Sequence, residues 1–181
     1  MDGDDIQHLK PGLKQQKLWV RMGLVICIAV LISAVGLQLF FPKTRLELTH
    51  ACQYCNLDGE NLAGWNLQNA GLHSVSLVNA DLRATNFNGA NLSNSKLRGA
   101  DIRGASFDNA TLRNSDLRRV RGVAATFIAS DMEASILDNA DFRTAELRFV
   151  NLRGASLKQT RLSRASLEGA QLDNVSASQV D

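Results

Sequence analysis

The chain lacks proline almost completely, and this absence already restricts its fold. Only Pro11 and Pro42 occur among 181 residues, so residues 43–181 contain no proline at all. A proline cannot donate a backbone hydrogen bond to a neighbouring strand. Its absence after Pro42 therefore favours a structure in which almost every amide joins a hydrogen-bond ladder.

The chain also lacks a strong excess of either charge. Residues 43–181 hold 16 Lys and Arg against 15 Asp and Glu, and the whole chain has a formal net charge of +2. Charged residues make up 21% of the sequence. This composition suits one modest domain with an accessory segment.

No catalytic constellation appears in the sequence. The three histidines, His8, His50 and His73, are scattered, and no glycine-rich phosphate loop is present. The neighbouring carboxylates Asp131 and Glu133 fall in positions that we expect to face water. We therefore predict a protein that is not an enzyme and that carries no cofactor or metal.

What the chain does have is a five-residue rhythm of large apolar residues, which neither an ordinary helix nor an ordinary strand can produce. The phase never slips, and only Gly122 breaks the apolar rule. These centres are Leu57, Leu62, Leu67, Leu72, Leu77, Leu82, Phe87, Leu92, Leu97, Ile102, Phe107, Leu112, Leu117, Gly122, Phe127, Met132, Leu137, Phe142, Leu147, Leu152, Leu157, Leu162, Leu167 and Leu172.

Each block combines a short extended segment with a corner. The residue two before a centre is mostly small, as at Ala80 and Ala90, and it shares the inward face with the centre. The residue between them, such as Asp81 or Asn91, points outward. Gly and Asn are frequent two residues after a centre, where a sharp corner needs a positive φ. Equal turns wind such a chain into a coil, and we predict a solenoid.

The blocks Ala80-Asp81-Leu82-Arg83-Ala84 and Ala90-Asn91-Leu92-Ser93-Asn94 closely resemble the pentapeptide-repeat family, whose consensus is A(D/N)LXX. The resemblance implies a right-handed quadrilateral parallel β-helix of about six coils, an all-β solenoid. It covers about residues 52–177. Some family members resemble duplex DNA and protect topoisomerases, which requires a strongly acidic surface that this near-neutral domain lacks.

A twenty-residue run without charge, from Met22 to Phe41, precedes the repeat and is long enough to cross a membrane as a helix. A cleaved signal peptide is the main alternative. The predicted organisation is a polar N-terminal tail (1–17), a transmembrane helix (18–41), a linker and N-terminal cap (42–51), the β-helix (52–177) and a C-terminal tail (178–181).

The charges that flank the apolar run predict its orientation. Lys10, Lys14, Lys17 and Arg21 precede the run, whereas only Lys43 and Arg45 closely follow it. The positive-inside rule then places the N-terminus in the cytoplasm. We predict a single-pass protein of a bacterial inner membrane with its repeat domain in the periplasm.

Two cysteines stand at the entrance to the repeat. On the five-residue grid Cys52 falls on a centre and Cys55 on a small inward position. They are either two reduced core cysteines or, in an oxidising compartment, a disulfide that closes the first coil. A metal site with His50 lacks a fourth ligand. The segment around both cysteines resembles the N-terminal cap of several pentapeptide-repeat proteins.

Arginines concentrate in the middle of the repeat and form a candidate patch for an anion or a partner. If a coil contains four blocks, residues twenty apart are stacked, so that Arg98 lies below Arg118. Such rows are commonly a solvated face with cross-strand pairing. The functional interpretation is a patch for lipid head groups, an anionic polymer or an acidic partner. Its residues are Arg98, Arg103, Arg118, Arg119 and Arg121.

Gly122 would leave a hole among the inward centres, so we predict a local bulge at Arg121-Gly122-Val123 that turns Val123 inward. Apolar residues fall in outward or corner positions nearby. If exposed together they would mark a contact site, whereas a shifted register would bury them. These residues are Val123, Ile128, Ile136 and Phe149.

The leading functional prediction is a non-enzymatic, membrane-tethered scaffold that binds an unknown protein or an anionic envelope component. The alternatives are a DNA mimic that protects topoisomerases and a thiol or disulfide module built on Cys52 and Cys55. No nucleic acid partner is expected. The solenoid shows no capping helix after Leu172, so an open edge is expected there, and with it a homodimer.

Overall fold

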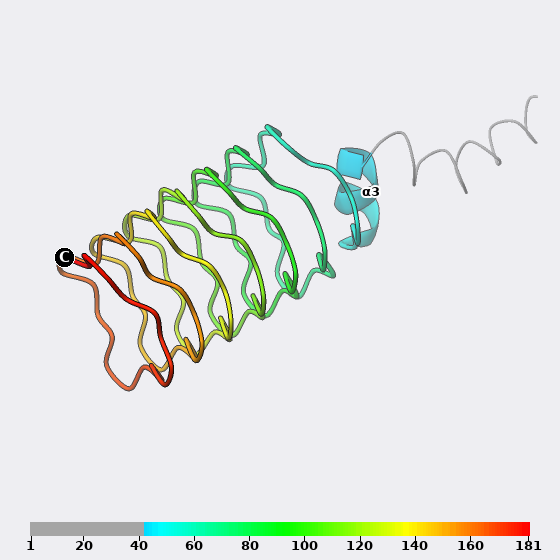
Figure 1. Ribbon diagram of the computed structural model, residues 1–181. Coiled ribbons are helices and arrows are strands. Elements are labelled where there is room, and N and C mark those ends of the chain that lie inside the picture. Colours follow the sequence, from blue (N-terminus) through cyan, green and yellow to red (C-terminus); the bar gives the residue numbers. More distant parts are fainter. Residues whose placement is uncertain (1–41) are drawn as a thin grey trace, which may run out of the picture. The chain divides into compact units, whose positions relative to one another are not determined.

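The computed structural model describes residues 42–181, which begin with a short helix and continue as a regular coil (Figure 1). Helix α3 spans Pro42–Thr49. Proline is well suited to the first position of a helix, where its missing N–H would have no partner. Leu46 of this helix is fully buried, and Lys43 forms an ion pair with Glu60 at 3.3 Å. The helix therefore packs on the beginning of the repeat.

The repeat contains no long strands, because each block contributes a single residue to parallel β-bridges. Every bridge joins a residue to the one twenty positions later, from Ala51–Gly71 to Ser156–Ser176. Backbone bonds follow the same register, as in Leu57 N to Ser76 O at 2.7 Å and Ser76 N to Cys55 O at 2.9 Å. Four blocks therefore complete one coil, and residues twenty apart form a column along the rod.

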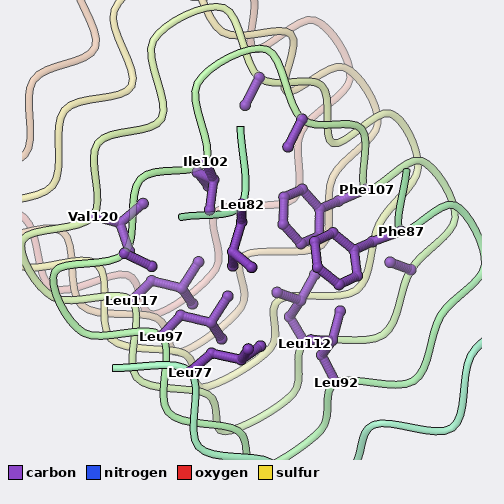
Figure 2. Packing of buried hydrophobic residues seen from close by; sticks show 14 of the residues in the cluster. Leu77, Leu82, Phe87, Leu92, Leu97, Ile102, Phe107, Leu112, Leu117 and Val120 are labelled. Carbon is purple, nitrogen blue, oxygen red and sulfur yellow. The ribbon is translucent and has the colours of Figure 1, made fainter. Parts of the chain in front are cut away.

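The centres fill the interior in four such columns. All the centres from Leu57 to Leu157 are buried, and Cys52 is buried in the corresponding position before them. Figure 2 shows Leu77, Leu97 and Leu117 stacked in one column, with Phe87 and Phe107 stacked in another. The phenylalanine rings of that column are nearly parallel, with centroids 4.8 Å apart for Phe87–Phe107 and for Phe107–Phe127. The predicted inward pattern is confirmed.

The predicted bulge at Gly122 is wrong. Arg121 keeps its bridges to Asp101 and Asp141, and Gly122 N donates to Asp141 O at 2.8 Å. A Cβ at Gly122 would lie 2.6 Å from Cδ1 of Phe142. The ring of Phe142, which meets Phe127 edge-on at 5.5 Å, therefore fills the space that Gly122 leaves. Val123 stays on the outside and is half-buried.

The corners adopt a positive φ even where the sequence does not favour it. Asn79 and Gly99 have φ of 57° and 71°, as the corner pattern predicts. Arg119, Ala134 and Phe149 occupy equivalent corners with φ between 55° and 60°. A left-handed conformation costs such residues about 1–2 kcal/mol each. The ladders on both sides of each corner impose it.

The predicted transmembrane helix, 18–41, and the polar tail, 1–17, lie outside the described residues. Within residues 42–181, no helix has the length and apolar character needed to cross a membrane. At the other end, residues 178–181 continue the coil register. Gln159 N donates to Ser178 O at 2.8 Å, and Leu162 N donates to Asp181 O at 3.2 Å.

Candidate anion-binding corner

The two cysteines of the first coil are joined by a disulfide, with their Cα atoms 5.4 Å apart. Cys52 is fully buried and Cys55 is 8% exposed. Between them, Tyr54 is exposed and meets the ring of His73 edge-on at 5.1 Å. In residues 42–181, no three side chains among His, Cys, Asp and Glu are placed to hold a metal ion. The disulfide is thus an inward, structural element of the cap.

Outside the core, arginines pair with aspartates two residues earlier in the same block. Residues on either side of a centre both point outward, so their side chains can meet. Arg83 donates from Nε and Nη2 to the two carboxylate oxygens of Asp81 at 2.8 and 2.7 Å. The same fork joins Arg103 to Asp101, Arg118 to Asp116 and Arg143 to Asp141.

These forks stabilise the charged form of each aspartate. The hydrogen bond from Arg83 lowers the pKa of Asp81 to about 2. Burial acts to raise the pKa of Asp101, but the hydrogen bonds from Arg103 and the charge of Arg121 outweigh it, so this pKa is lowered. The carboxylates of the forks are therefore ionised well below neutral pH.

Arg121 breaks the order of its column. Asp81, Asp101 and Asp141 occupy this column in the coils before and after it. Arg121 instead donates to Oδ2 of Asp101 at 2.9 Å. Two guanidinium groups thus share one carboxylate, and the column gains a positive charge where the neighbouring coils carry a negative one.

The arginines gather at one edge of the square coil, which we call the arginine corner. Its residues are Arg83, Arg98, Arg103, Arg118, Arg119 and Arg121 together with Asp81, Asp101 and Asp116. Six arginines against three aspartates leave an excess of three positive charges. All five arginines of the predicted patch belong to it, and Arg98 and Arg118 fall in one column as predicted.

Two shallow depressions adjoin at this corner and share Asn79 and Gly99. One, of about 260 Å³, is lined by Asn79, Ala80, Asp81, Arg83, Gly99, Asp101, Arg103 and Arg121. The other, of about 290 Å³, is lined by Val78, Asn79, Arg98, Gly99 and Arg119. The arginine corner therefore offers concave surface that carries positive charge.

The four apolar residues of the predicted contact site are not brought together. Val123 and Ile128 follow the centres Gly122 and Phe127 on successive sides of the coil, whereas Ile136 precedes Leu137 on another. Ile136 and Phe149 are exposed, and Val123 and Ile128 are half-buried. The ring of Phe149 lies over Gly169 of the next coil, where a Cβ would come within 2.4 Å of its Cδ1.

Sequence reasoning missed the forks, although a signal for them was present. The spacing Asp-x-Arg recurs at Asp81, Asp101, Asp116 and Asp141, each time around a centre. Because the outward residues of one block are two apart, this spacing predicts pairing within a block. Pairing between coils occurs as well, as in the bond from Arg113 Nε to Asp131 and in the contact of Arg121 with Asp101.

The repeat matches known protein families along its whole length. The family model described as "Pentapeptide repeat region" matches residues 50–127, and the model described as "Pentapeptide repeats (8 copies)" matches residues 125–164 and 145–181. The chain belongs to the pentapeptide-repeat family. Its members form right-handed quadrilateral β-helices, so the predicted handedness and square section are confirmed. Members of this family are in general structural or protective proteins rather than enzymes.

This chain is similar to solved structures of pentapeptide-repeat proteins. The protein Rfr23 of the cyanobacterium Cyanothece 51142 is 27% identical, with a TM-score of 0.50 over 76% of this chain and 97% of that one. HetL of Nostoc sp. strain PCC 7120, involved in heterocyst differentiation regulation, is 23% identical with a TM-score of 0.33, over 71% of this chain and 72% of HetL.

A third solved structure is that of QnrB1, a plasmid-mediated fluoroquinolone resistance protein. It is 14% identical with a TM-score of 0.49, over 71% of this chain and 79% of QnrB1. No relative was found among curated protein sequences.

Proposed function

We propose that this pentapeptide-repeat protein is a non-enzymatic scaffold, tethered to a bacterial inner membrane by residues 18–41, that binds an anionic envelope component or an acidic protein. The observation that carries the proposal is the arginine corner, where three positive charges in excess lie on a backbone held by continuous ladders. A rod of about six coils keeps such side chains in place before a partner binds.

The disulfide supports a location outside the cytoplasm. Disulfides persist mainly in oxidising compartments such as the periplasm. The bond between Cys52 and Cys55 agrees in this respect with the orientation that the flanking positive charges predict.

The alternative functions have less support. A DNA mimic needs an acidic surface, whereas the arginine corner is positive and residues 43–181 are nearly neutral. A thiol-exchange module needs an accessible sulfur, whereas Cys52 is fully buried and Cys55 is 8% exposed.

A reporter fusion and a capture experiment test the proposal. Alkaline phosphatase fused after Asp181 is expected to be active, since it folds only outside the cytoplasm, and an inactive but expressed fusion would contradict the proposed location. Crosslinking in native membranes is expected to capture one component on the wild-type chain. A variant with Arg98, Arg119 and Arg121 changed to Glu should lose that component.

The matched control changes Arg113, Arg148 and Arg153, which lie outside the arginine corner, to Glu. It removes the same charge and should retain the captured component. Equal capture by both triple variants would show that the arginine corner is not the binding surface.

A further inference from the structure

Within residues 42–181, two arginines of the arginine corner, Arg98 and Arg119, form no ion pair. Val78, Asn79, Arg98, Gly99 and Arg119 line the depression of about 290 Å³, which we call the Gly99 notch. These residues come from three successive coils, since Asn79, Gly99 and Arg119 are twenty residues apart in one column. The notch is therefore held by three layers of the ladder.

Gly99 allows the side chain of Asn79 to form the floor of the notch. A Cβ at this residue would lie 2.4 Å from Oδ1 of Asn79, so the side chain of Asn79 can lie across Gly99 only because Gly99 has none. The backbone of Gly99 has a φ of 71° and its N–H donates to Arg118 O at 2.9 Å. The side chain of Asn79 thus occupies the step of the column between Asn79 and Arg119.

The two guanidinium groups of the notch differ from the others of the arginine corner. Arg83, Arg103, Arg118 and Arg121 each lie within 3.0 Å of an aspartate oxygen. Within residues 42–181, neither Arg98 nor Arg119 has a carboxylate within the 4.0 Å of an ion pair, and no acidic residue lines the notch. Their N–H donors therefore remain available to a ligand.

We propose that the Gly99 notch binds a phosphate group, held by the guanidinium groups of Arg98 and Arg119. A guanidinium presents its N–H donors in a planar fork that matches two phosphate oxygens, and two such groups match a dianion. The nearby arginines add positive potential, while Asp101 and Asp116 are already bonded to their own arginines. The inference rests on the proposed function, because it names the group by which the scaffold would recognise an envelope component.

Calorimetric titration of the full chain in a neutral detergent with inorganic phosphate tests the notch. One saturable site is expected at neutral pH. Because each lost charge-assisted bond weakens binding by about tenfold or more, the variant Arg98→Gln/Arg119→Gln should bind about a hundredfold more weakly. The control Arg113→Gln/Arg153→Gln removes two arginines of another side of the coil and should stay within about twofold of the wild type.

Two results would overturn the assignment: no saturable binding by the wild type, or equal weakening in both double variants, which would indicate diffuse attraction only. Circular dichroism of each variant establishes that the coil is intact. If the wild-type chain captures its component in membranes but does not bind phosphate, the notch is rejected and the proposed scaffold is not.

Two further ligands distinguish the source of the phosphate group. Glycerol 3-phosphate carries the group without acyl chains, and dihexanoyl phosphatidic acid carries it on a short-chain lipid. Binding of the lipid at least about tenfold more tightly than glycerol 3-phosphate, lost in Arg98→Gln/Arg119→Gln, supports the notch as a headgroup site. Equal affinities, lost in the same variant, support it as a site for free phosphate.

Discussion

At the scale of single residues, Gly122 and Phe142 show how the core tolerates a centre without a side chain. The column of Gly122 holds Ile102 before it and Phe142 after it, and Phe142 is the larger residue needed to fill both its own layer and the layer of Gly122. Dense packing is thereby kept without a change of register. The two residues form a complementary pair.

The first prediction concerns substitutions that change the side-chain sizes of Gly122 and Phe142. Gly122→Leu should destabilise the fold by about 1–3 kcal/mol, because its side chain overlaps the ring of Phe142. Phe142→Leu alone should leave a cavity over Gly122 and also destabilise. The double variant Gly122→Leu/Phe142→Leu should recover most of the loss, as urea unfolding monitored by circular dichroism can measure. Simple addition of the two losses would mean that the residues do not share this space.

The same pair shows a limit of prediction from the sequence. The five-residue rhythm correctly placed Gly122 on an inward position and correctly indicated missing volume. The side chain that fills the missing volume lies twenty residues later, at Phe142. The sequence alone does not give the number of residues in one coil, so it offers no reason to compare these two positions. The sequence alone therefore predicts a local bulge, whereas Phe142 in the next layer supplies the missing atoms.

At the scale of the five-residue block, the Asp-x-Arg fork is the recurring element of the surface. It ties the two outward residues of a block together across an inward centre, and it lowers the pKa of Asp81, Asp101, Asp116 and Asp141. A carboxyl group whose pKa is lower in the folded chain stabilises the fold wherever it is ionised. The forks should therefore make stability depend on pH in the acid range.

The second prediction follows from the direction of these shifts. The stabilisation of the fold by the forks should be complete above the pKa of about 3.9 that an aspartate has in the unfolded chain. It should disappear as the pH falls through the lower pKa values of the folded chain, which for Asp81 is about 2. The urea midpoint should thus fall between about pH 4 and pH 2. Asp101→Asn should flatten this dependence, since its carboxylate binds both Arg103 and Arg121.

The matched control for Asp101→Asn is Asp173→Asn, which removes a mostly exposed carboxylate near the end of the coil. It should leave the acid dependence closer to that of the wild type. An unchanged midpoint in the wild-type chain between pH 4 and pH 2 would contradict the role of the forks.

The block also shows which part of the candidate site was predictable. The concentration of arginines was visible in the sequence, and the assumed coil of four blocks correctly stacked Arg98 with Arg118. The Gly99 notch was not predicted, because its shape depends on the path of Asn79 over Gly99. Likewise, the sequence groups Ile136 and Phe149 together as outward or corner apolar residues. In the structure they lie on different sides of the coil.

At the scale of the whole molecule, the burial of the inward centres is uniform along most of the coil and declines near its C-terminal end. Every centre is buried as far as Leu157, whereas Leu162 and Leu167 are half-buried and Leu172 is 48% exposed. Each earlier layer is covered by the coil that follows it, whereas residues 162–181 form the last layer that the structure describes. The contribution of a leucine to the free energy of unfolding should therefore depend on the layer in which it lies.

The third prediction compares two leucines of one column. Leu92→Ala should lower the free energy of unfolding by about 2–5 kcal/mol, because Leu92 is fully buried between two layers. Leu172→Ala, in the same column but half exposed, should cost less than about 1 kcal/mol. Urea unfolding of the full chain measures both. Similar losses would mean that the last coil is covered in solution.

The twenty-residue register also determines how this chain can change in length. Loss of one residue inside the repeat would turn every following centre outward on its side, and loss of one block would rotate all later columns by a quarter turn. Only the removal or duplication of a complete coil returns each side chain to a column of its own kind. Growth of such a protein by whole-coil duplication would lengthen the rod while leaving the arginine corner unchanged.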